Sequence, residues 1–425
     1  MEVKFQAWDT AGKPIRCKAA MARKAGEPLV MEEVEVAPPK AWEVRIKILC
    51  TSLCHSDVTF WKTPAGPASF FPRIFGHEAA GVVESVGENV EEVKGGDLVL
   101  PIFQRNCGEC RDCKSEKGNA CSKFPVQFYE GMPRDGTSRF TDMNGEIVHH
   151  FFGVSSFAEY TVVDISQVVK MSLEIPIDKA CLLSCGVTTG VGAACKFARV
   201  EEGSVVAIFG LGAVGLAVAE GARLCKASRI IGVDLNPEKF EIGKKFGITD
   251  FVNPTSCGEK SVSQVIQEMT DGGADYCFEC IGLASLMADA FNSSRQGGGK
   301  TVVLGVEMHG SPLSINAYEI LRGRTVMGCL FGGLKPKSDI SSFAKMYLDH
   351  ELNLDGFITH EVSFKDINQA FDLLLQGKSL RCIIWMDNIK RLYRASRIIG
   401  VDLNPEKFEI CWLSYISSQD MNLLN

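Results

Sequence analysis

A glycine-rich loop between a buried strand and a helix constrains the fold of this 425-residue chain more than any other stretch. The apolar run at residues 204–209 leads directly into GLGAVG at residues 210–215, and small residues typical of a tightly packed helix follow. A second strand, at residues 229–234, ends in Asp234, 24 positions after the first glycine of the loop. This order of strand, glycine loop, helix, strand and acidic residue is the dinucleotide-binding fingerprint of a doubly wound parallel sheet.

The glycines and the acid each have a physical role in that fingerprint. Gly210, Gly212 and Gly215 would let the backbone turn sharply and approach a pyrophosphate, whose charge meets the N-terminus of the next helix. Asp234 would accept hydrogen bonds from ribose hydroxyls and would repel a 2′-phosphate, so the sequence favours NAD over NADP. The alternative is an α/β sheet in which the glycines serve only close packing.

Two cysteines and one histidine indicate a metal site of a catalytic kind. Two thiolates, Cys54 and Cys185, and the imidazole of His77 form a complete protein ligand set for zinc. Three donors leave the fourth tetrahedral position open for water or substrate. Because Cys54 and Cys185 are 131 positions apart, this prediction depends on the fold to bring them together.

Four further cysteines predict a structural zinc site. They follow one another at intervals of three, three and eight residues: Cys107, Cys110, Cys113 and Cys121. An all-cysteine set with no vacant position is a structural site, and the segment around it has little apolar content, so metal binding would supply its folding energy. The alternative is four unrelated surface thiols.

Composition narrows the class of protein. The net charge of −7 and the pI near 5.7 give no reason to expect nucleic acid or an anionic membrane as a partner. No apolar run reaches the roughly 18 residues that a membrane span requires, and the first residues lack the pattern of a secretory signal. We therefore interpret the 17 cysteines as reduced thiols and metal ligands, and we expect a cytoplasmic protein.

The chain is long enough for two domains. We expect residues 1–186 and 331–388 to form a β-rich domain that carries the four-cysteine lobe, because short strand patterns broken by Gly and Pro fill its first part. Residues 187–330 are predicted to form the Rossmann NAD-binding domain. Residues 389–425 are interpreted as an atypical appended tail.

The tail contains an exact internal repeat. Residues 227–242 recur without a change at residues 395–410. The second copy has no glycine loop before it, so Asp402 has no phosphate site to complement and is given no cofactor role. A single short copy is not a solenoid unit, since such units need several copies to bury a core. Our hypothesis is that this tail is poorly packed.

The motifs together resemble one family. The two zinc signatures, GHEAAGVVESVGENV at residues 76–90 and IFGLGAVGLAVAEGA at residues 208–222 are similar to the zinc-dependent medium-chain alcohol dehydrogenases, in particular the plant alcohol dehydrogenase-like type. The likeness runs from about Lys13 to Arg381. It implies a GroES-like catalytic domain beside the Rossmann domain, two zinc ions per subunit, NAD-dependent oxidation of primary or secondary alcohols, and a homodimer.

The resemblance also implies roles for individual residues. The catalytic zinc ligands would be Cys54, His77 and Cys185, and the structural ligands Cys107, Cys110, Cys113 and Cys121. Around the catalytic zinc, Asp57 would orient His77, Glu78 would tune the metal and Ser56 would begin a proton relay. The NAD-binding residues would be His55, Thr189, Gly210, Gly212, Val214, Gly215, Asp234, Lys239 and Arg381. The alcohol would bind against Phe103, Phe151 and Phe152. His55 as a solvated loop histidine and Ser56 as a turn hydroxyl are the alternatives.

Two departures from the family pattern bear on function. Thr59 stands where some relatives carry a proton-relaying histidine, so the proton exit is expected to differ. Pro125 stands where glutathione-dependent formaldehyde dehydrogenases carry an arginine, although Arg105 or Arg134 could substitute. The alternatives are therefore an S-(hydroxymethyl)glutathione dehydrogenase and, from another class, a zinc- and NAD-binding protein with little catalysis because of its tail.

Overall fold

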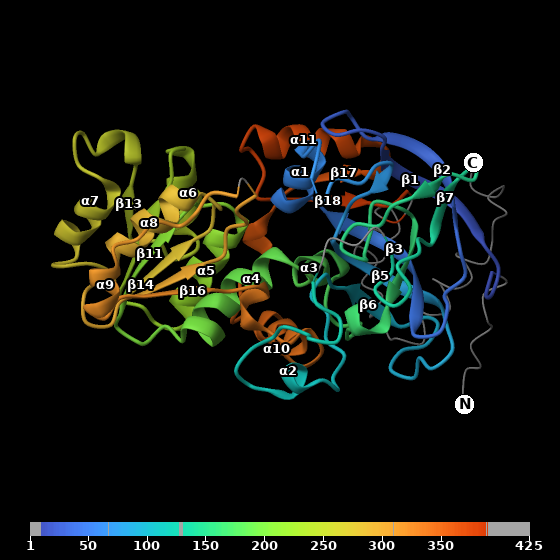
Figure 1. Ribbon diagram of the computed structural model, residues 1–425, viewed down its shortest axis with the longest axis horizontal. Helices are drawn as coiled ribbons and strands as arrows, with labels where there is room; N and C mark the ends of the chain where they lie inside the picture. The colour runs from blue at the N-terminus through green and yellow to red at the C-terminus, as the bar shows by residue number, and fades with distance from the viewer. Residues whose placement is uncertain (1–9, 67, 127–130, 309, 388, 390–425) are drawn as a thin grey trace. The chain divides into compact units, whose positions relative to one another are not determined.

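The computed structural model describes residues 10–66, 68–126, 131–308, 310–387 and 389. The chain divides into two compact units (Figure 1). Unit 1 comprises Met1–Cys107, Phe124–Cys181 and His360–Asn425, and unit 2 comprises Gly108–Lys123 and Leu182–Thr359. The repeated segment at residues 395–410, with Asp402, lies outside the described residues, so the hypothesis of a poorly packed tail stays a prediction.

Two β-sheets form most of unit 1. The five-stranded sheet has the order β4 (Arg73–Ile74), β1 (Ile15–Ala22), β2 (Val30–Val36), β7 (Phe140–Asp142) and β8 (Ile147–Val148). The larger sheet has the order β10 (Val168–Lys170), β6 (Leu98–Pro101), β5 (Glu78–Val86), β3 (Glu43–Ser52), β18 (Arg381–Trp385) and β17 (Ile358–Ser363), and β9 (Tyr160–Asp164) also pairs with β3. The helices are α1 (His55–Lys62), α3 (Ile177–Leu182) and α11 (Ile367–Leu375), with 3-10 turns η1 (Ile165–Gln167) and η6 (Phe364–Asp366).

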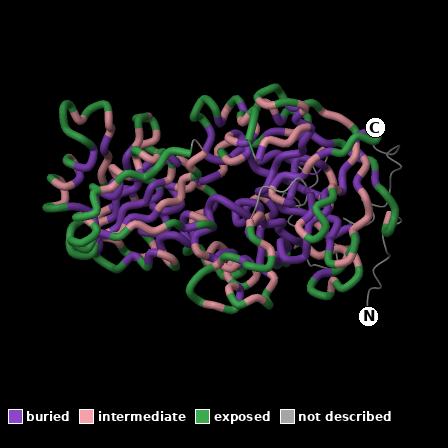
Figure 2. The backbone as a smooth tube through the Cα atoms, in the orientation of Figure 1, coloured by how far each residue is buried: buried purple, intermediate pink, exposed green. Residues whose placement is uncertain are grey.

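Strand β3 lies at the centre of this unit. It pairs antiparallel with β5, β9 and β18, and nine of its ten residues are buried. Burial continues along the strand without alternating, so residues on both of its faces are covered, and Figure 2 shows a concentration of buried residues in the middle of this unit. Register shifts after Arg45 and Ile48 bend the strand, and such bulges commonly redirect side chains near a functional site.

Unit 2 is a parallel α/β sheet. Its strands lie in the order β13 (Asp250–Val252), β12 (Arg229–Val233), β11 (Val205–Phe209), β14 (Tyr276–Glu279), β15 (Lys300–Val303) and β16 (Thr325–Gly328). Its helices are α2 (Arg111–Lys114), α4 (Gly186–Gly192), the π-helix η2 (Ala193–Ala198), α5 (Ala213–Leu224), α6 (Glu238–Lys244), α7 (Val262–Met269), α8 (Ala284–Ser293), α9 (Ala317–Leu321) and α10 (Pro336–Leu348). Short 3-10 turns are η3 (Pro254–Ser256), η4 (Phe331–Gly333) and η5 (Asp355–Phe357).

The strand order of unit 2 determines where a ligand can bind. In chain order the six strands follow the 3-2-1-4-5-6 arrangement of a doubly wound sheet, and every neighbouring pair is parallel. The order reverses between β11 and β14, and ligands of such sheets bind beyond the carboxyl ends of the strands at this point. The glycine loop follows β11 at that position.

Among the described residues, no helix combines the length and the apolarity that crossing a membrane would need.

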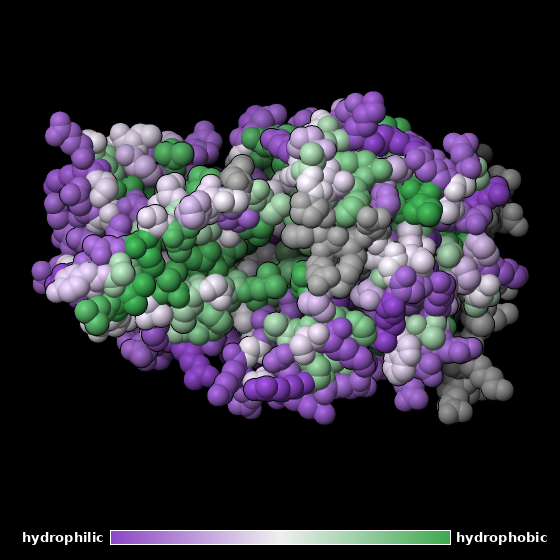
Figure 3. All heavy atoms as spheres, viewed as in Figure 1, coloured by the Kyte–Doolittle hydropathy of each residue, from purple (hydrophilic) through white to green (hydrophobic). Residues whose placement is uncertain are grey.

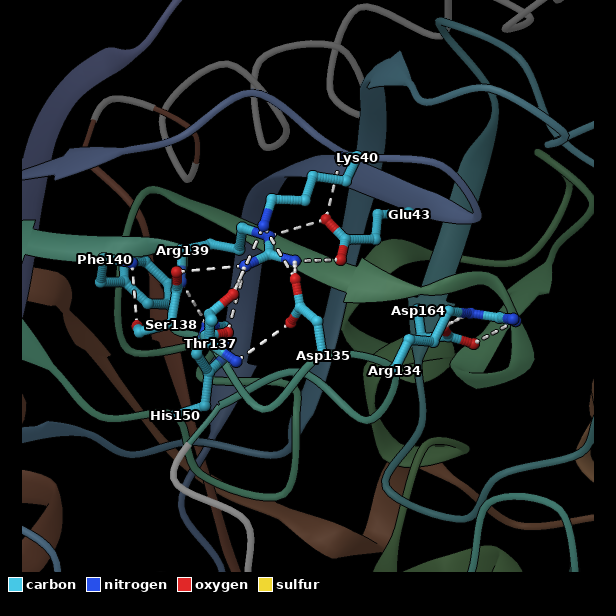
Figure 4. Close-up of polar contacts among 10 residues, drawn as sticks. All are labelled: Lys40, Glu43, Arg134, Asp135, Thr137, Ser138, Arg139, Phe140, His150 and Asp164. Atoms are coloured by element: carbon cyan, nitrogen blue, oxygen red, sulfur yellow. Dashed lines mark hydrogen bonds and ion pairs between the residues drawn. The ribbon is translucent and has the colours of Figure 1, made fainter.

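A buried ion-pair network fixes a loop of unit 1 onto the start of β3 (Figure 4). Arg139 donates from Nε to one oxygen of Glu43 at 2.8 Å and from Nη2 to the other at 2.5 Å. The side chains of Arg139 and Glu43 are only 1% and 2% exposed. Asp135 accepts from both Arg139 and the Lys40 ammonium, at 2.9 and 2.8 Å. Each buried charge is thus paired and hydrogen-bonded, as its desolvation requires.

We predict that Glu43→Ala destabilises the protein by about 3 kcal/mol, because the Arg139 guanidinium then stays buried with a single acidic partner. The matched control is Lys40→Met, which removes a side chain that is 59% exposed and should cost less than about 1 kcal/mol. Urea unfolding followed by intrinsic fluorescence compares the two variants. Equal unfolding midpoints for both variants would contradict the importance of the buried pair.

Candidate metal and cofactor sites

The three predicted catalytic ligands lie at the ends of neighbouring elements. Cys54 is the N-cap of α1, two residues after β3, and His77 directly precedes β5. Because Ser52 of β3 pairs with Glu78 of β5, Cys54 and His77 come to the same end of the sheet. Cys185 is the N-cap of α4. The structure brings the donor atoms of all three within 4.8 Å of one another, and all three residues are buried.

This donor set fits a tetrahedral zinc ion. Zn–S bonds of about 2.3 Å place neighbouring ligand atoms of a tetrahedral site about 3.8 Å apart. This separation is compatible with donor atoms that all lie within 4.8 Å of one another. Sulfur and imidazole nitrogen are ligands that zinc prefers, and three of them leave one coordination position open.

A buried carboxylate holds two of these ligands in place. Asp57 Oδ1 lies 3.0 Å from His77 Nδ1 and accepts the Gly76 N–H at 3.0 Å. Asp57 Oδ2 accepts the Cys54 N–H, also at 3.0 Å, which forms one half of a capping box at the start of α1. With Nδ1 engaged, His77 presents Nε2 as the metal-binding atom. The side chain predicted to orient the imidazole is thus in position to do so.

The protonation of His77 also depends on this environment. Burial by itself would lower its pKa, but the Asp57 carboxylate and the Cys54 sulfur raise the pKa to about 10. An imidazole with this pKa is doubly protonated and positively charged at neutral pH. A metal ion that binds to it displaces one of the two ring protons, so metal uptake would release protons.

Glu78 and Arg381 form a second buried pair in this region. Arg381 Nε donates to Glu78 Oε1 at 2.8 Å, and Arg381 Nη2 lies 3.6 Å from Cys54 Sγ. Burial raises the pKa of Glu78, while Arg381 opposes that rise. The family resemblance gives Arg381 a role toward the pyrophosphate, and the structure places its guanidinium among Glu78 and Cys54.

Helix α1 carries the predicted proton-relay residues. The Ser56 hydroxyl is half-buried and lies 3.9 Å from Cys54 Sγ, which places it beside the metal ligands. Thr59 donates its hydroxyl to the His55 carbonyl at 2.9 Å, so this hydroxyl stabilises its own helix. His55 is exposed at the first position of α1.

Aromatic rings surround one side of His77. The ring centres of Phe103, Phe151 and Phe152 lie 5.9, 5.6 and 5.5 Å from that of the imidazole. Sequence reasoning missed Phe60, whose ring lies 5.4 Å from both Phe151 and Phe152. The available signal was its position four residues after Ser56 on a helix, which places both side chains on one face.

The four-cysteine set also comes together. The sulfurs of Cys107, Cys110, Cys113 and Cys121 lie within 4.8 Å of one another. Burial opposes ionisation of Cys110, but hydrogen bonds from the Ser122 side chain and from the Cys113 and Lys123 backbone lower its pKa to about 5. A cysteine with this pKa is a thiolate at neutral pH, which is the form that binds zinc.

The glycine loop of unit 2 has the shape of a phosphate-binding turn. A Cβ at Gly215 would lie 1.8 Å from the Gly210 carbonyl oxygen, so only glycine allows α5 to begin this close to the loop. Gly210 has φ near +91°, in the region that favours glycine. A Cβ at Gly212 would meet no atom within 4 Å. The backbone is therefore open to a ligand at Gly212, at the N-terminus of α5.

Asp234 lies next to this loop as the fingerprint requires. Its Oδ2 accepts the Leu211 N–H at 2.8 Å, and its Oδ1 accepts the Asn236 N–H at 2.9 Å. Lys239 Nζ is 3.7 Å from Asp234 Oδ2. On α4 and α5, Thr189 and Val214 are half-buried, and the Thr189 hydroxyl donates to the Cys185 carbonyl at 2.8 Å. The loop and Asp234 together fit the adenosine half of NAD.

Comparison with known proteins identifies the family. Residues 40–173 match the model of the alcohol dehydrogenase GroES-like domain, and residues 213–349 match that of the zinc-binding dehydrogenases. Alcohol dehydrogenase-like 2 of Arabidopsis thaliana is 66% identical over 379 residues, which cover 89% of this chain and 98% of the relative. The chain belongs to the zinc-dependent medium-chain alcohol dehydrogenase family.

Solved structures agree with this assignment. The alcohol dehydrogenase zinc-binding domain protein of Burkholderia ambifaria has a TM-score of 0.80 and 31% identity, covering 88% of this chain and 99% of that one. The benzyl alcohol dehydrogenase of Acinetobacter calcoaceticus has a TM-score of 0.79 and 28% identity over the same shares. The predicted fold class, a Rossmann sheet with a GroES-like β-rich domain, is confirmed, and the chain is an oxidoreductase of the zinc alcohol dehydrogenase type.

We predict that Asp57→Asn weakens zinc binding at the Cys54, His77 and Cys185 set by about 10- to 100-fold, because the amide cannot accept all three hydrogen bonds. The four-cysteine set should keep its metal. The release of zinc to a chromogenic chelator, followed over time, distinguishes zinc held at the two ligand sets. The control is Asp349→Asn, which makes the same change at an exposed position. Identical release curves for the two variants would show that Asp57 does not support the site.

Proposed function

We propose that this chain is an NAD-dependent alcohol dehydrogenase that oxidises primary or secondary alcohols to aldehydes or ketones. The observation that carries the proposal is the buried set of two cysteines and one histidine, which offers zinc three ligands and leaves one position for a substrate oxygen. The four-cysteine set supports a second, structural zinc ion per chain.

The residues of the chain divide the work of such a reaction among them. When bound, zinc supplies the Lewis acidity that lowers the pKa of an alcohol, and NAD⁺ accepts the hydride. Asp57 fixes the imidazole of His77 and the backbone of Cys54. The Ser56 hydroxyl, beside the Cys54 sulfur, is the group placed to take the proton of the alcohol. The Thr59 hydroxyl is already donated to a helix carbonyl, so we propose that it does not continue the relay.

The aromatic side chains bear on the substrate class. Phe151 is buried, while Phe103 and Phe152 are half-buried and so have more side-chain surface to offer a substrate. We propose that the latter two contact the apolar part of the alcohol and keep water from it. Both rings are apolar and uncharged, which supports uncharged aliphatic or aromatic alcohols as substrates.

Two arginines bear on the glutathione-dependent alternative. Arg105 is 1% exposed and donates to Gln167 Oε1 at 3.2 Å and to the Pro125 carbonyl at 2.7 Å. Arg134 is paired with Asp164 and stacks on the Trp42 and Phe124 rings. Because both guanidinium groups are engaged within the protein, they do not favour binding of a glutathione carboxylate.

The experiment that tests the proposal is NADH formation by the full-length protein with a ladder of primary, secondary and benzylic alcohols, and with S-hydroxymethylglutathione. We expect turnover on simple alcohols that exceeds turnover on the glutathione adduct. Zinc-loaded protein that forms no NADH with any alcohol would leave the alternative of a binding protein with little catalysis.

We predict that Asp234→Gly raises the KM for NAD⁺ about tenfold or more, with a much smaller effect on kcat, because the ribose hydroxyls lose their acceptor. The same variant should gain activity with NADP⁺, since the carboxylate no longer repels a 2′-phosphate. Steady-state kinetics with each cofactor measure both effects. An unchanged ratio of kcat/KM for the two cofactors would show that Asp234 does not select NAD.

We propose a second copy of this chain as the protein partner. Strand β16 is at the edge of the parallel sheet. Exposed apolar side chains flank it on α9 and in the turn after β16: Tyr318 (60% exposed), Ile320 (48%), Leu321 (80%) and Leu330 (48%). Figure 3 shows apolar side chains gathered over β16 and α9. An edge strand beside an apolar patch favours pairing with the same strand of another copy around a two-fold axis. Cysteines can bind zinc only as reduced thiolates, so the two sets of possible ligands support a reducing compartment, for which we propose the cytoplasm.

We predict that Leu321→Asp shifts the protein from dimer toward monomer, because a charge would be buried in the apolar contact. The control is Ile147→Asp, which makes the same change at a side chain of unit 1 that is 58% exposed. Sedimentation velocity at several concentrations measures the result. A wild-type monomer, or two variants with the same association, would rule out this interface.

A further inference from the structure

Two cysteines of unit 2 outside both metal sets lie side by side. Cys195 Sγ and Cys225 Sγ are 3.4 Å apart, and both residues are half-buried. Cys195 belongs to the π-helix η2, and Cys225 is the C-cap of α5. Neither is assigned a role in zinc binding, cofactor binding or packing of a substrate.

The closeness of the sulfurs follows from glycines between the helices. A Cβ at Gly221 of α5 would come within 2.8 Å of the Ala194 Cβ, and one at Gly190 of α4 would come within 2.4 Å of the Ala217 Cβ. Without these side chains the backbones of α4, η2 and α5 pack directly against one another. Because Cys195 follows Ala194 directly in the chain, this close approach places Cys195 against the C-terminal end of α5.

One carbonyl orients both cysteines. The Gly221 oxygen accepts the Cys225 N–H at 3.0 Å and the Cys195 thiol at 3.4 Å. The side chain of Cys195 and the backbone of Cys225 are therefore hydrogen-bonded to the same oxygen atom. Short π-helical turns are often found at functional sites, and here the turn carries Cys195.

The two thiols differ in acidity. In the neutral pair the Cys225 thiol donates to the Cys195 sulfur. Once Cys225 has lost its proton, the Cys195 thiol can turn and donate to the thiolate, which lowers the pKa of Cys225 below its ordinary value, although burial opposes this. The same bond raises the pKa of Cys195. A thiol with a lowered pKa beside a thiol with a raised pKa is the usual arrangement of an attacking and a resolving cysteine.

We propose that Cys195 and Cys225 form a reversible intramolecular disulfide on exposure to a hydroperoxide such as hydrogen peroxide. The Cys225 thiolate attacks one peroxide oxygen, the O–O bond breaks, and a sulfenic acid and, after protonation, water result. The Cys195 sulfur then attacks the sulfenic sulfur, the S–O bond breaks, and a second water leaves. Two thiols and one hydrogen peroxide give one disulfide and two waters, and a thiol reductant reverses the change.

Little movement is needed for this bond. A disulfide has an S–S distance of about 2.05 Å, so the sulfurs must approach by about 1.4 Å from the present 3.4 Å. The bond would close a loop between positions 30 apart in the sequence. It would clamp α5, which begins at the glycine loop, to the segment that begins at Cys185, and so stabilise unit 2 against unfolding.

The test uses the full-length, zinc-loaded protein treated with a few equivalents of hydrogen peroxide, blocked with N-ethylmaleimide, digested and analysed by mass spectrometry. We expect a peptide pair linked through Cys195 and Cys225 that disappears on treatment with dithiothreitol. The oxidised protein should retain its zinc and melt roughly 5–10 °C higher than the reduced protein. Cys195→Ser and Cys225→Ser should lose both effects. Cys257→Ser, which removes another half-buried thiol of unit 2, should keep them.

Three results would overturn the proposal. The first is wild-type protein in which Cys225 is oxidised to the sulfinic acid without the linked peptide. The second is a linked peptide that forms only together with loss of zinc. The third is a rise in melting temperature that persists in both serine variants. None of these readouts depends on alcohol oxidation, so the inference stands or fails separately from the proposed function.

Discussion

The hydrogen bonds of the Asp57 carboxylate organise the region on which the rest of the account depends. A single buried side chain engages His77 and the backbone groups of Cys54 and Gly76, each at 3.0 Å. A buried carboxylate is costly unless every lone pair has a partner, and here the partners are the metal ligands and their backbone. The same interactions that stabilise the fold therefore position the ligands for zinc.

In unit 2, the glycine residues likewise contribute both to the packing of the fold and to a binding site. Gly215 lets α5 begin against the Gly210 carbonyl, while Gly212 leaves the adjoining backbone open. The same glycine loop thus allows α5 to pack closely after β11 and leaves a backbone surface to which a phosphate can bind. The same use of glycine between α4 and α5 brings Cys195 against Cys225. Close packing therefore produces both the cofactor-binding shape and the proposed disulfide.

Motifs with fixed local spacing could be predicted from the sequence, and contacts between distant side chains could not. The glycine loop and Asp234 form one continuous unit, so their arrangement in space follows from the strand order. The proximity of Cys54, His77 and Cys185 was predicted only from the chemistry of the donors and the family resemblance. No sequence pattern revealed that Arg381 pairs with Glu78, because that contact joins positions 303 apart. Phe60 was missed because an aromatic residue on a helix has the same pattern whether it packs a core or a site.

The central claim is that Cys54, His77 and Cys185 hold a zinc ion with one position left open. Zinc K-edge X-ray absorption and metal analysis of the full-length protein, beside Cys185→Ala, test it most directly. The account predicts two zinc ions per chain with a first shell of sulfur mixed with nitrogen and oxygen, and a single, all-sulfur zinc in the variant. Wild-type protein with one all-sulfur zinc, or a variant that keeps both ions, would contradict it.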